Sequence, residues 1–137
     1  IFWFKNKKYM ACISTLLPLF DTELVNIQIK EDENSNKKIG KSGVKKLEKY
    51  FLNKNVSFIN YFFQFSIYTY LINLYEKTDN FNTTQYNINR NMVLHGMSKR
   101  MYTEIDCIKL FNAYTIYKIV TLYFNDLELE IDSSESA

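Results

Sequence analysis

The chain has 137 residues, of which 47% are hydrophobic and 17% aromatic, and it carries a formal net charge of +2. This length and composition predict one domain with a packed core and exclude a disordered chain. Three glycines and one proline are too few turn residues for a sandwich or barrel of many short strands. We therefore expect an all-α protein.

Apolar residues recur at helical spacing along most of the chain. The pattern predicts helices over residues 2–29, 44–54, 56–75, 88–95 and 103–124. A kink or break is expected near Pro18, a helix cap at Ser42, and a capping box between Thr103 and Asp106. These elements predict a four- to five-helix bundle over residues 1–125, followed by a fraying acidic tail at 126–137.

Two segments have features of a leader or a membrane span. Residues 5–20 join a basic flank to an apolar run, but no small-residue cleavage site follows them. Residues 56–75 carry no charge, yet Asn60, Gln64 and Asn73 spread polar groups round the helix. We expect this helix to be central and covered by protein on most sides, with no membrane contact.

The chain offers few histidine or cysteine ligands for a metal. Its single histidine and its two cysteines, Cys12 and Cys107, form no CxxC pair or zinc-type cluster, so no metal or other cofactor is expected. Two separate cysteines indicate buried thiols in a reducing, cytoplasmic setting, although a disulfide between them stays open.

Positive charge is concentrated before the central helix. Seven basic residues fall within 18 positions: Lys37, Lys38, Lys41, Lys45, Lys46, Lys49 and Lys54. Such a block is either solvated surface or an electrostatic contact site.

The stretch NRNMVLHG, residues 89–96, holds the only histidine and one of two arginines. On a helix, Asn91 and His95 share a face, whereas Arg90 points about 140° away from His95. Met92, Val93 and Leu94 face the core, and Gly96 suits the left-handed residue that ends a helix. The helix dipole favours the His95 cation by about 0.3–1 kcal/mol.

The histidine and the arginine of this stretch also have a purely structural interpretation. A histidine before a C-terminal glycine is a common helix end, and an arginine at a helix start often pairs with a nearby acid. Arginine is scarce in this chain, however, and its guanidinium binds phosphate through two parallel hydrogen bonds.

The sequence RNMVLH resembles the R-x4-6-H signature of HEPN (higher eukaryotes and prokaryotes nucleotide-binding) domains. The longer NRNMVLHG, with TEIDCIKLFNAYTIYKI after it, resembles a bacterial branch with an NRxxxxHG motif, over roughly residues 87–124. The resemblance implies a helical bundle that dimerises through the motif face. Many such proteins are metal-independent endoribonucleases, and others are inactive binding or assembly modules.

Carried over to this chain, the resemblance makes Arg90 the group that grips the scissile phosphate. His95 would transfer a proton or contact the phosphate, and Asn91 would orient one of the two. An acid often steadies the arginine in this family, and Glu104 and Asp106 are the candidates here.

Cleavage of RNA through its own 2′-OH benefits from a base, an acid and a cation. One histidine per chain leaves one of these roles unfilled, so a homodimer that brings two copies of His95 to a shared cleft is expected. The RNA backbone would be held by Lys45, Lys46, Lys49, Lys99 and Arg100. The alternatives are an inactive HEPN-like module for nucleotide or RNA binding or dimerisation, and a plain helical interaction domain.

Overall fold

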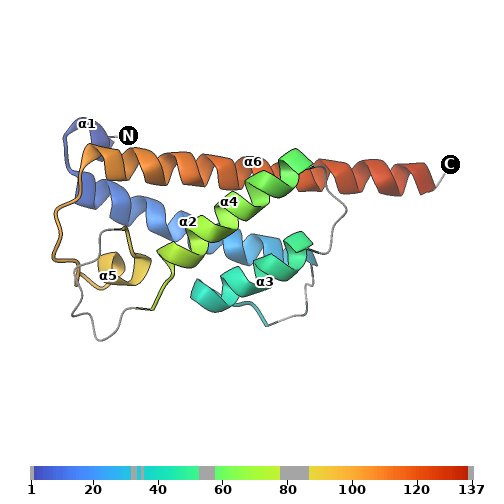
Figure 1. The fold of residues 1–137 in the computed structure, drawn as a ribbon, viewed down its shortest axis with the longest axis horizontal. Coiled ribbons are helices and arrows are strands. Elements are labelled where there is room, and N and C mark those ends of the chain that lie inside the picture. The colour runs from blue at the N-terminus through green and yellow to red at the C-terminus, as the bar shows by residue number, and fades with distance from the viewer. Residues whose placement is uncertain (1, 32–33, 35, 53–57, 78–86, 136–137) are drawn as a thin grey trace.

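The computed structural model describes residues 2–31, 34, 36–52, 58–77 and 87–135 (Figure 1). Regular structure within these ranges is helical, without strands, which confirms the predicted all-α class. The helices are α1 (Phe2–Lys5), α2 (Tyr9–Glu31), α3 (Gly40–Leu52), α4 (Phe58–Leu74), α5 (Arg90–Leu94) and α6 (Glu104–Glu135).

Two long helices organise the fold. In Figure 1, α2 and α6 lie side by side and run in the same direction, and α4 crosses them diagonally. Helix α3 packs on α2 and α4, and the short α5 packs on α2. The C-terminal end of α6 extends past the other helices.

The core lies mainly between α2 and α6. Helix α2 contributes Ile13, Leu17, Phe20, Leu24 and Ile27, which alternate at spacings of four and three and are all buried. From α6, Tyr117 stacks on Phe20 with ring centroids 6.2 Å apart. A fully buried side chain of this kind contributes about 1.5–3 kcal/mol, so this stripe fixes the pairing of the two helices.

The first predicted helix breaks at a different place from the one expected. Helix α2 is continuous through Pro18, whereas Lys7, with φ of 56°, separates α1 from α2. Pro18 is exposed, so water can hydrate the carbonyl that loses its partner there.

Helix α3 begins earlier than predicted and does not start at Ser42. Gln28 holds the preceding loop, because its amide donates to the Lys38 carbonyl at 2.6 Å and accepts from the Lys38 N–H at 2.8 Å. A Cβ at Gly43 would lie 2.4 Å from the same carbonyl oxygen, so only glycine permits this close approach.

Helix α4 is less covered than expected. Its buried side chains are Gln64, Ile67, Leu71 and Leu74, which form one face. Six apolar side chains in its first half are exposed: Phe58, Ile59, Tyr61, Phe62, Phe63 and Phe65. The prediction of a central helix covered on most sides is therefore wrong.

Helix α6 also differs from the prediction, because it continues to Glu135 where a fraying tail was expected after Phe124. The division into a domain at 1–125 and a tail stays a prediction. Among the described helices, the segment Tyr9–Ile29 of α2 is long and apolar enough to cross a membrane by length and composition alone. Much of this segment is buried against α6 and α3, as in a core helix.

Both cysteines are free and buried at the contact of α2 with α6. Burial, followed by the neighbouring Cys12, raises the pKa of the Cys107 thiol to about 12. The reactive thiolate is therefore scarce at neutral pH.

We expect native protein at pH 8 to react with a thiol reagent at neither cysteine, and urea-unfolded protein to react at both Cys12 and Cys107. Absorbance from a chromogenic disulfide reagent measures this directly. Rapid reaction of one thiol in the folded protein would contradict the burial described here.

Candidate functional site

The motif forms a short helix with a well-defined cap at each end. Asn89 is the N-cap, and its side-chain oxygen accepts from the Met92 N–H at 3.1 Å. Its amide group donates to the Glu76 carbonyl at 2.8 Å, which ties α5 to the end of α4. Asn89 is buried, so these two bonds satisfy a polar side chain that would otherwise be costly inside the protein.

The C-terminal end of α5 follows the prediction. Gly96 adopts φ of +66°, its N–H bonds the Val93 carbonyl at 3.1 Å, and the Met97 N–H bonds the Met92 carbonyl at 2.8 Å. This is the Schellman arrangement of a helix that ends on glycine. Met92 and Val93 are buried as predicted, and His95 is the C-cap.

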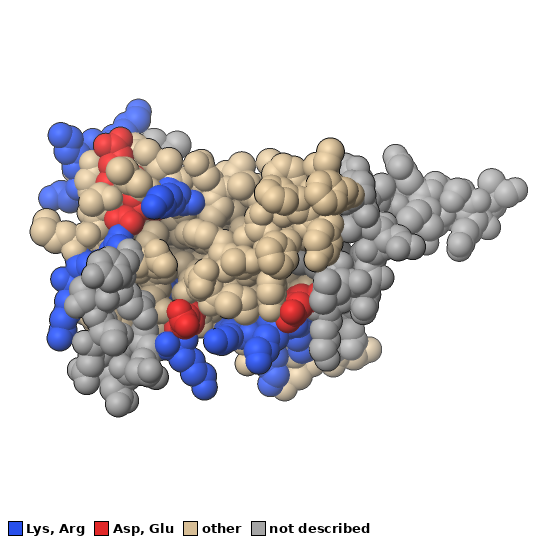
Figure 2. All heavy atoms as spheres, in the orientation of Figure 1, with Lys and Arg blue, Asp and Glu red and all other residues tan. Residues whose placement is uncertain are grey.

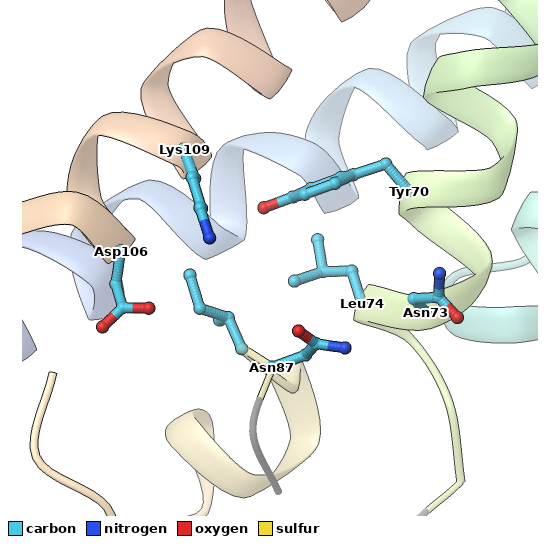
Figure 3. A pocket seen from close by; sticks show the side chains of 7 residues that line it. Tyr70, Asn73, Leu74, Asn87, Asp106 and Lys109 are labelled. Atoms are coloured by element: carbon cyan, nitrogen blue, oxygen red, sulfur yellow. The ribbon is translucent and has the colours of Figure 1, made fainter.

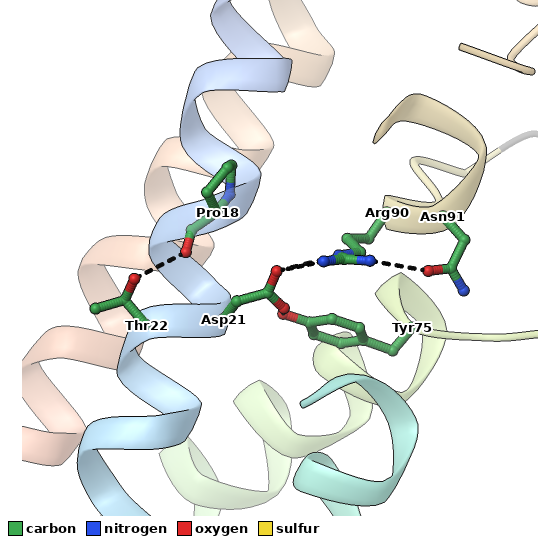
Figure 4. A network of polar contacts seen from close by, with 6 residues as sticks. All are labelled: Pro18, Asp21, Thr22, Tyr75, Arg90 and Asn91. Carbon is green, nitrogen blue, oxygen red and sulfur yellow. Dashed lines mark hydrogen bonds and ion pairs between the residues drawn. The ribbon is translucent and has the colours of Figure 1, made fainter. Parts of the chain in front are cut away.

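Arg90 projects from α5 onto α2 (Figure 4). Its Nη2 and Nε donate to one oxygen of the Asp21 carboxylate, at 2.6 Å and 3.2 Å. The side chains of Arg90 and Asp21 are 19% and 17% exposed, so this ion pair is largely shielded from water. The remaining described contact of the guanidinium runs from Nη1 to the Asn91 side-chain oxygen at 3.3 Å.

Tyr75 completes the cluster from the end of α4. Its hydroxyl donates to the other Asp21 oxygen at 2.7 Å. Burial raises the pKa of Tyr75 far above its usual value, and the nearby Asp21 carboxylate adds to the effect. The phenol therefore stays protonated at neutral pH and keeps its role as a hydrogen-bond donor to Asp21.

Asp21 was not found from the sequence, and the proposed partners of Arg90 are corrected. Asp106 pairs with Arg100 and forms the predicted capping box with Thr103, whose N–H donates to it at 2.9 Å. Burial raises the pKa of Asp106, but hydrogen bonds from Thr103 and Arg100 outweigh burial and hold it below its usual value. Glu104 lies exposed in the first turn of α6. The one feature of the sequence that could have pointed to Asp21 as a partner of Arg90 was the presence of a carboxylate inside the apolar stretch of α2.

His95 occupies a different setting from Arg90. It is exposed at the end of α5, and its backbone N–H bonds the Asn91 carbonyl at 3.1 Å. The described hydrogen bonds of the Arg90 side chain go to Asp21 and Asn91, and none of them reaches His95. Asn91 is half-buried and reaches the arginine. Helix α5 begins at Arg90, two residues later than the predicted start at residue 88.

The five predicted RNA-binding residues fall into two groups. Lys45 and Lys46 lie on α3, where Figure 2 shows basic side chains along the lower edge, and Lys46 donates to the Asn36 carbonyl at 2.7 Å. Lys99 is exposed between α5 and α6. Arg100 is committed to Asp106 and lies over the Tyr102 ring, 4.8 Å from its centroid. The side chain of Lys49 lies outside the described part of the structure.

A cavity of about 160 Å³ opens beside the motif (Figure 3). It is lined by Tyr70, Asn73, Leu74, Asn87, Ile88, Asp106 and Lys109. Burial, with the Asp106 carboxylate second, raises the pKa of Tyr70 to about 12. The cavity therefore presents a protonated phenol and an ammonium group, which can bind a few waters or a small polar group.

Within the described ranges, no group of three or more His, Cys, Asp or Glu residues is arranged to hold a metal ion. Comparisons with protein-family models, with curated proteins and with solved structures found no match. The site is therefore characterised by its geometry alone.

The ion pair predicts a strong energetic coupling between Asp21 and Arg90. In a double-mutant cycle of Asp21→Asn and Arg90→Gln, we expect a coupling free energy of about 1.5–3 kcal/mol, because both charges are largely shielded. Urea unfolding of the four proteins measures it.

The matched control pairs Arg90→Gln with Thr22→Ala, since Thr22 is exposed on α2 and its hydroxyl bonds the Pro18 carbonyl. That cycle should be additive within about 0.5 kcal/mol. Additivity of the Asp21 cycle as well would show that the ion pair does not hold α5.

Proposed function

We propose that this chain is a HEPN-type endoribonuclease that cleaves RNA without a metal and acts as a homodimer. The observation that carries the proposal is the Asp21–Arg90 ion pair at the start of a helix that ends at an exposed histidine. An acid that steadies the motif arginine is a feature of the family that the sequence resembles. Asp21 supplies such an acid, and the neutral Tyr75 phenol fixes its second oxygen.

The proposed reaction uses the 2′-OH of the substrate as nucleophile. One His95 imidazole removes the 2′-OH proton, and the oxygen attacks the adjacent phosphorus. The bond to the 5′-oxygen breaks as that oxygen receives a proton from the His95 of the second subunit, which leaves a cyclic phosphate and a free 5′-OH. Arg90 stabilises the charge on the non-bridging oxygens.

Only part of the Arg90 guanidinium is available to bind the phosphate of the substrate. The described hydrogen bonds to Asp21 and Asn91 use three of its five N–H groups. The two that remain, one on each terminal nitrogen, would contact the phosphate. Asn91, in contact with Nη1, would keep this edge oriented.

Exposed lysines would guide the RNA backbone to the motif. Lys45 on α3 and Lys99 next to α5 are exposed cations, and both α3 and α5 pack on α2. Binding through such groups weakens steeply as salt is added, because it releases counterions from the RNA.

A second candidate, a non-catalytic module that binds RNA or nucleotide or mediates dimerisation, is favoured by one observation. The Nε and Nη2 groups of Arg90 are those of an edge that binds phosphate bidentately, and here they bind Asp21. In such a module Arg90 holds α5 in place and His95 has no proton to transfer.

The test is RNA cleavage in EDTA by the purified full chain. We expect His95→Ala to lower the cleavage rate by about 100-fold or more, the usual loss when an acid–base group is removed. Arg90→Lys should lower it strongly as well, because lysine keeps the charge but loses the planar donor geometry.

Met97→Ala is the matched control, since Met97 is an exposed neighbour of the motif and should leave the rate unchanged. Cleavage that His95→Ala leaves intact would contradict the site. If the chain cleaves no RNA but binds it with a steep salt dependence, the endoribonuclease proposal is wrong and the binding module stands.

A further inference from the structure

Helix α6 carries a second apolar stripe on its outer surface. The stripe consists of Ile105, Ile108, Asn112, Thr115, Ile119 and Leu122, which alternate at spacings of three and four. All six side chains are exposed, and the four apolar ones are 63%, 43%, 60% and 55% exposed in chain order. Isolated exposed apolar residues are common on proteins, but a regular heptad stripe is not. This set is called the outer stripe below.

The outer stripe lies on the side of α6 away from the core. At 100° per residue, its centre falls about 160° from that of the buried positions Cys107, Leu110 and Tyr117. Those buried positions face α2, so a partner on the outer stripe would not compete with the packing of the core. Residues 105–122 span about five helical turns, which is long enough for another helix to lie along them.

The composition of the outer stripe matches a second helix with the same sequence. Alternation at three and four is the spacing by which knobs of one helix enter holes of another in a two-stranded coiled coil. Ile105, Asn112 and Ile119 occupy the a positions, and a single asparagine at an a position fixes register and favours a pair of helices. In a parallel pair, Asn112 meets the same residue of the second copy.

The flanking charges also favour pairing with a second copy. In parallel register the g position of one helix meets the following e position of the other, so Glu104 of each copy faces Lys109 of the other. In antiparallel register Glu104 would need Lys118, which already donates to the largely shielded Glu23 carboxylate at 3.0 Å. The charges are therefore complementary in the parallel arrangement.

We propose that two copies of this chain associate through the outer stripes of α6, as a parallel two-stranded coiled coil over residues 104–122. This contact is distinct from the motif-face dimer of the proposed function, because α5 packs on α2 and the outer stripe faces away from α2. The proposal therefore stands or falls independently of any ribonuclease activity.

The first test is sedimentation equilibrium of the full chain at protein concentrations up to about 200 µM, which measures the dissociation constant of the pair. Ile119→Asp should raise that constant at least tenfold, because it buries a charge in the seam. Ile39→Asp is the matched control, as Ile39 is 55% exposed and lies outside α6. Asn112→Leu keeps the helix and should tighten the association.

The second test is oxidative cross-linking, which reports the register. Asn112→Cys alone should form a disulfide-linked dimer, whereas Asn26→Cys, at an exposed position on α2, should not. A monomer at every concentration, or equal effects of Ile119→Asp and Ile39→Asp, would overturn the proposal. Cross-linking only between Asn112→Cys and Thr115→Cys chains would overturn the parallel register.

Discussion

The Asp21 carboxylate joins three parts of the fold that are distant in sequence. One oxygen binds Arg90 of α5 and the other binds the Tyr75 hydroxyl at the end of α4. A carboxylate removed from water needs such partners, and both of its oxygens have them. Helix α5 has five residues and would not form alone, so its position depends on this cluster and on the Asn89 bond to Glu76.

This arrangement restrains the side chain of Arg90 more than that of His95. Arg90 is fixed and largely shielded, whereas His95 is exposed at a helix end held by Gly96. One chain therefore presents a positioned cation at the start of α5 and, at the other end of this helix, an imidazole that is open to a substrate or to a second subunit. In the proposed function, dimerisation at the motif face would combine two such copies into one enzyme site. The inactive-module alternative describes the chain without that step.

Local rules predicted local structure well. The end of α5 at His95 and Gly96 and the Thr103–Asp106 capping box depend on residues within one turn of each other. The Asp21–Arg90 pair spans 69 positions and exists only because α5 packs on α2, so spacing along the chain could not reveal it. The Arg100–Asp106 ion pair was missed for the same reason, since it forms only once the loop after α5 is placed. The uncharged sequence of α4 correctly predicted a helix, but it did not predict how much of that helix other helices cover. A lack of charge permits burial of a helix face but does not determine which helix packs against it.

The most direct measurement is NMR of the Arg90 side chain, with its Nε–H assigned through Arg90→Lys. The structure predicts a slowly exchanging Nε–H with a scalar coupling to the Asp21 carboxyl carbon across the hydrogen bond. On addition of a short RNA with 2′-deoxy sugars at the cleavage step, the Nη signals should shift while that coupling persists. Loss of the coupling in the free protein, or Nη signals that RNA leaves unchanged, would contradict an arginine that Asp21 holds for a phosphate.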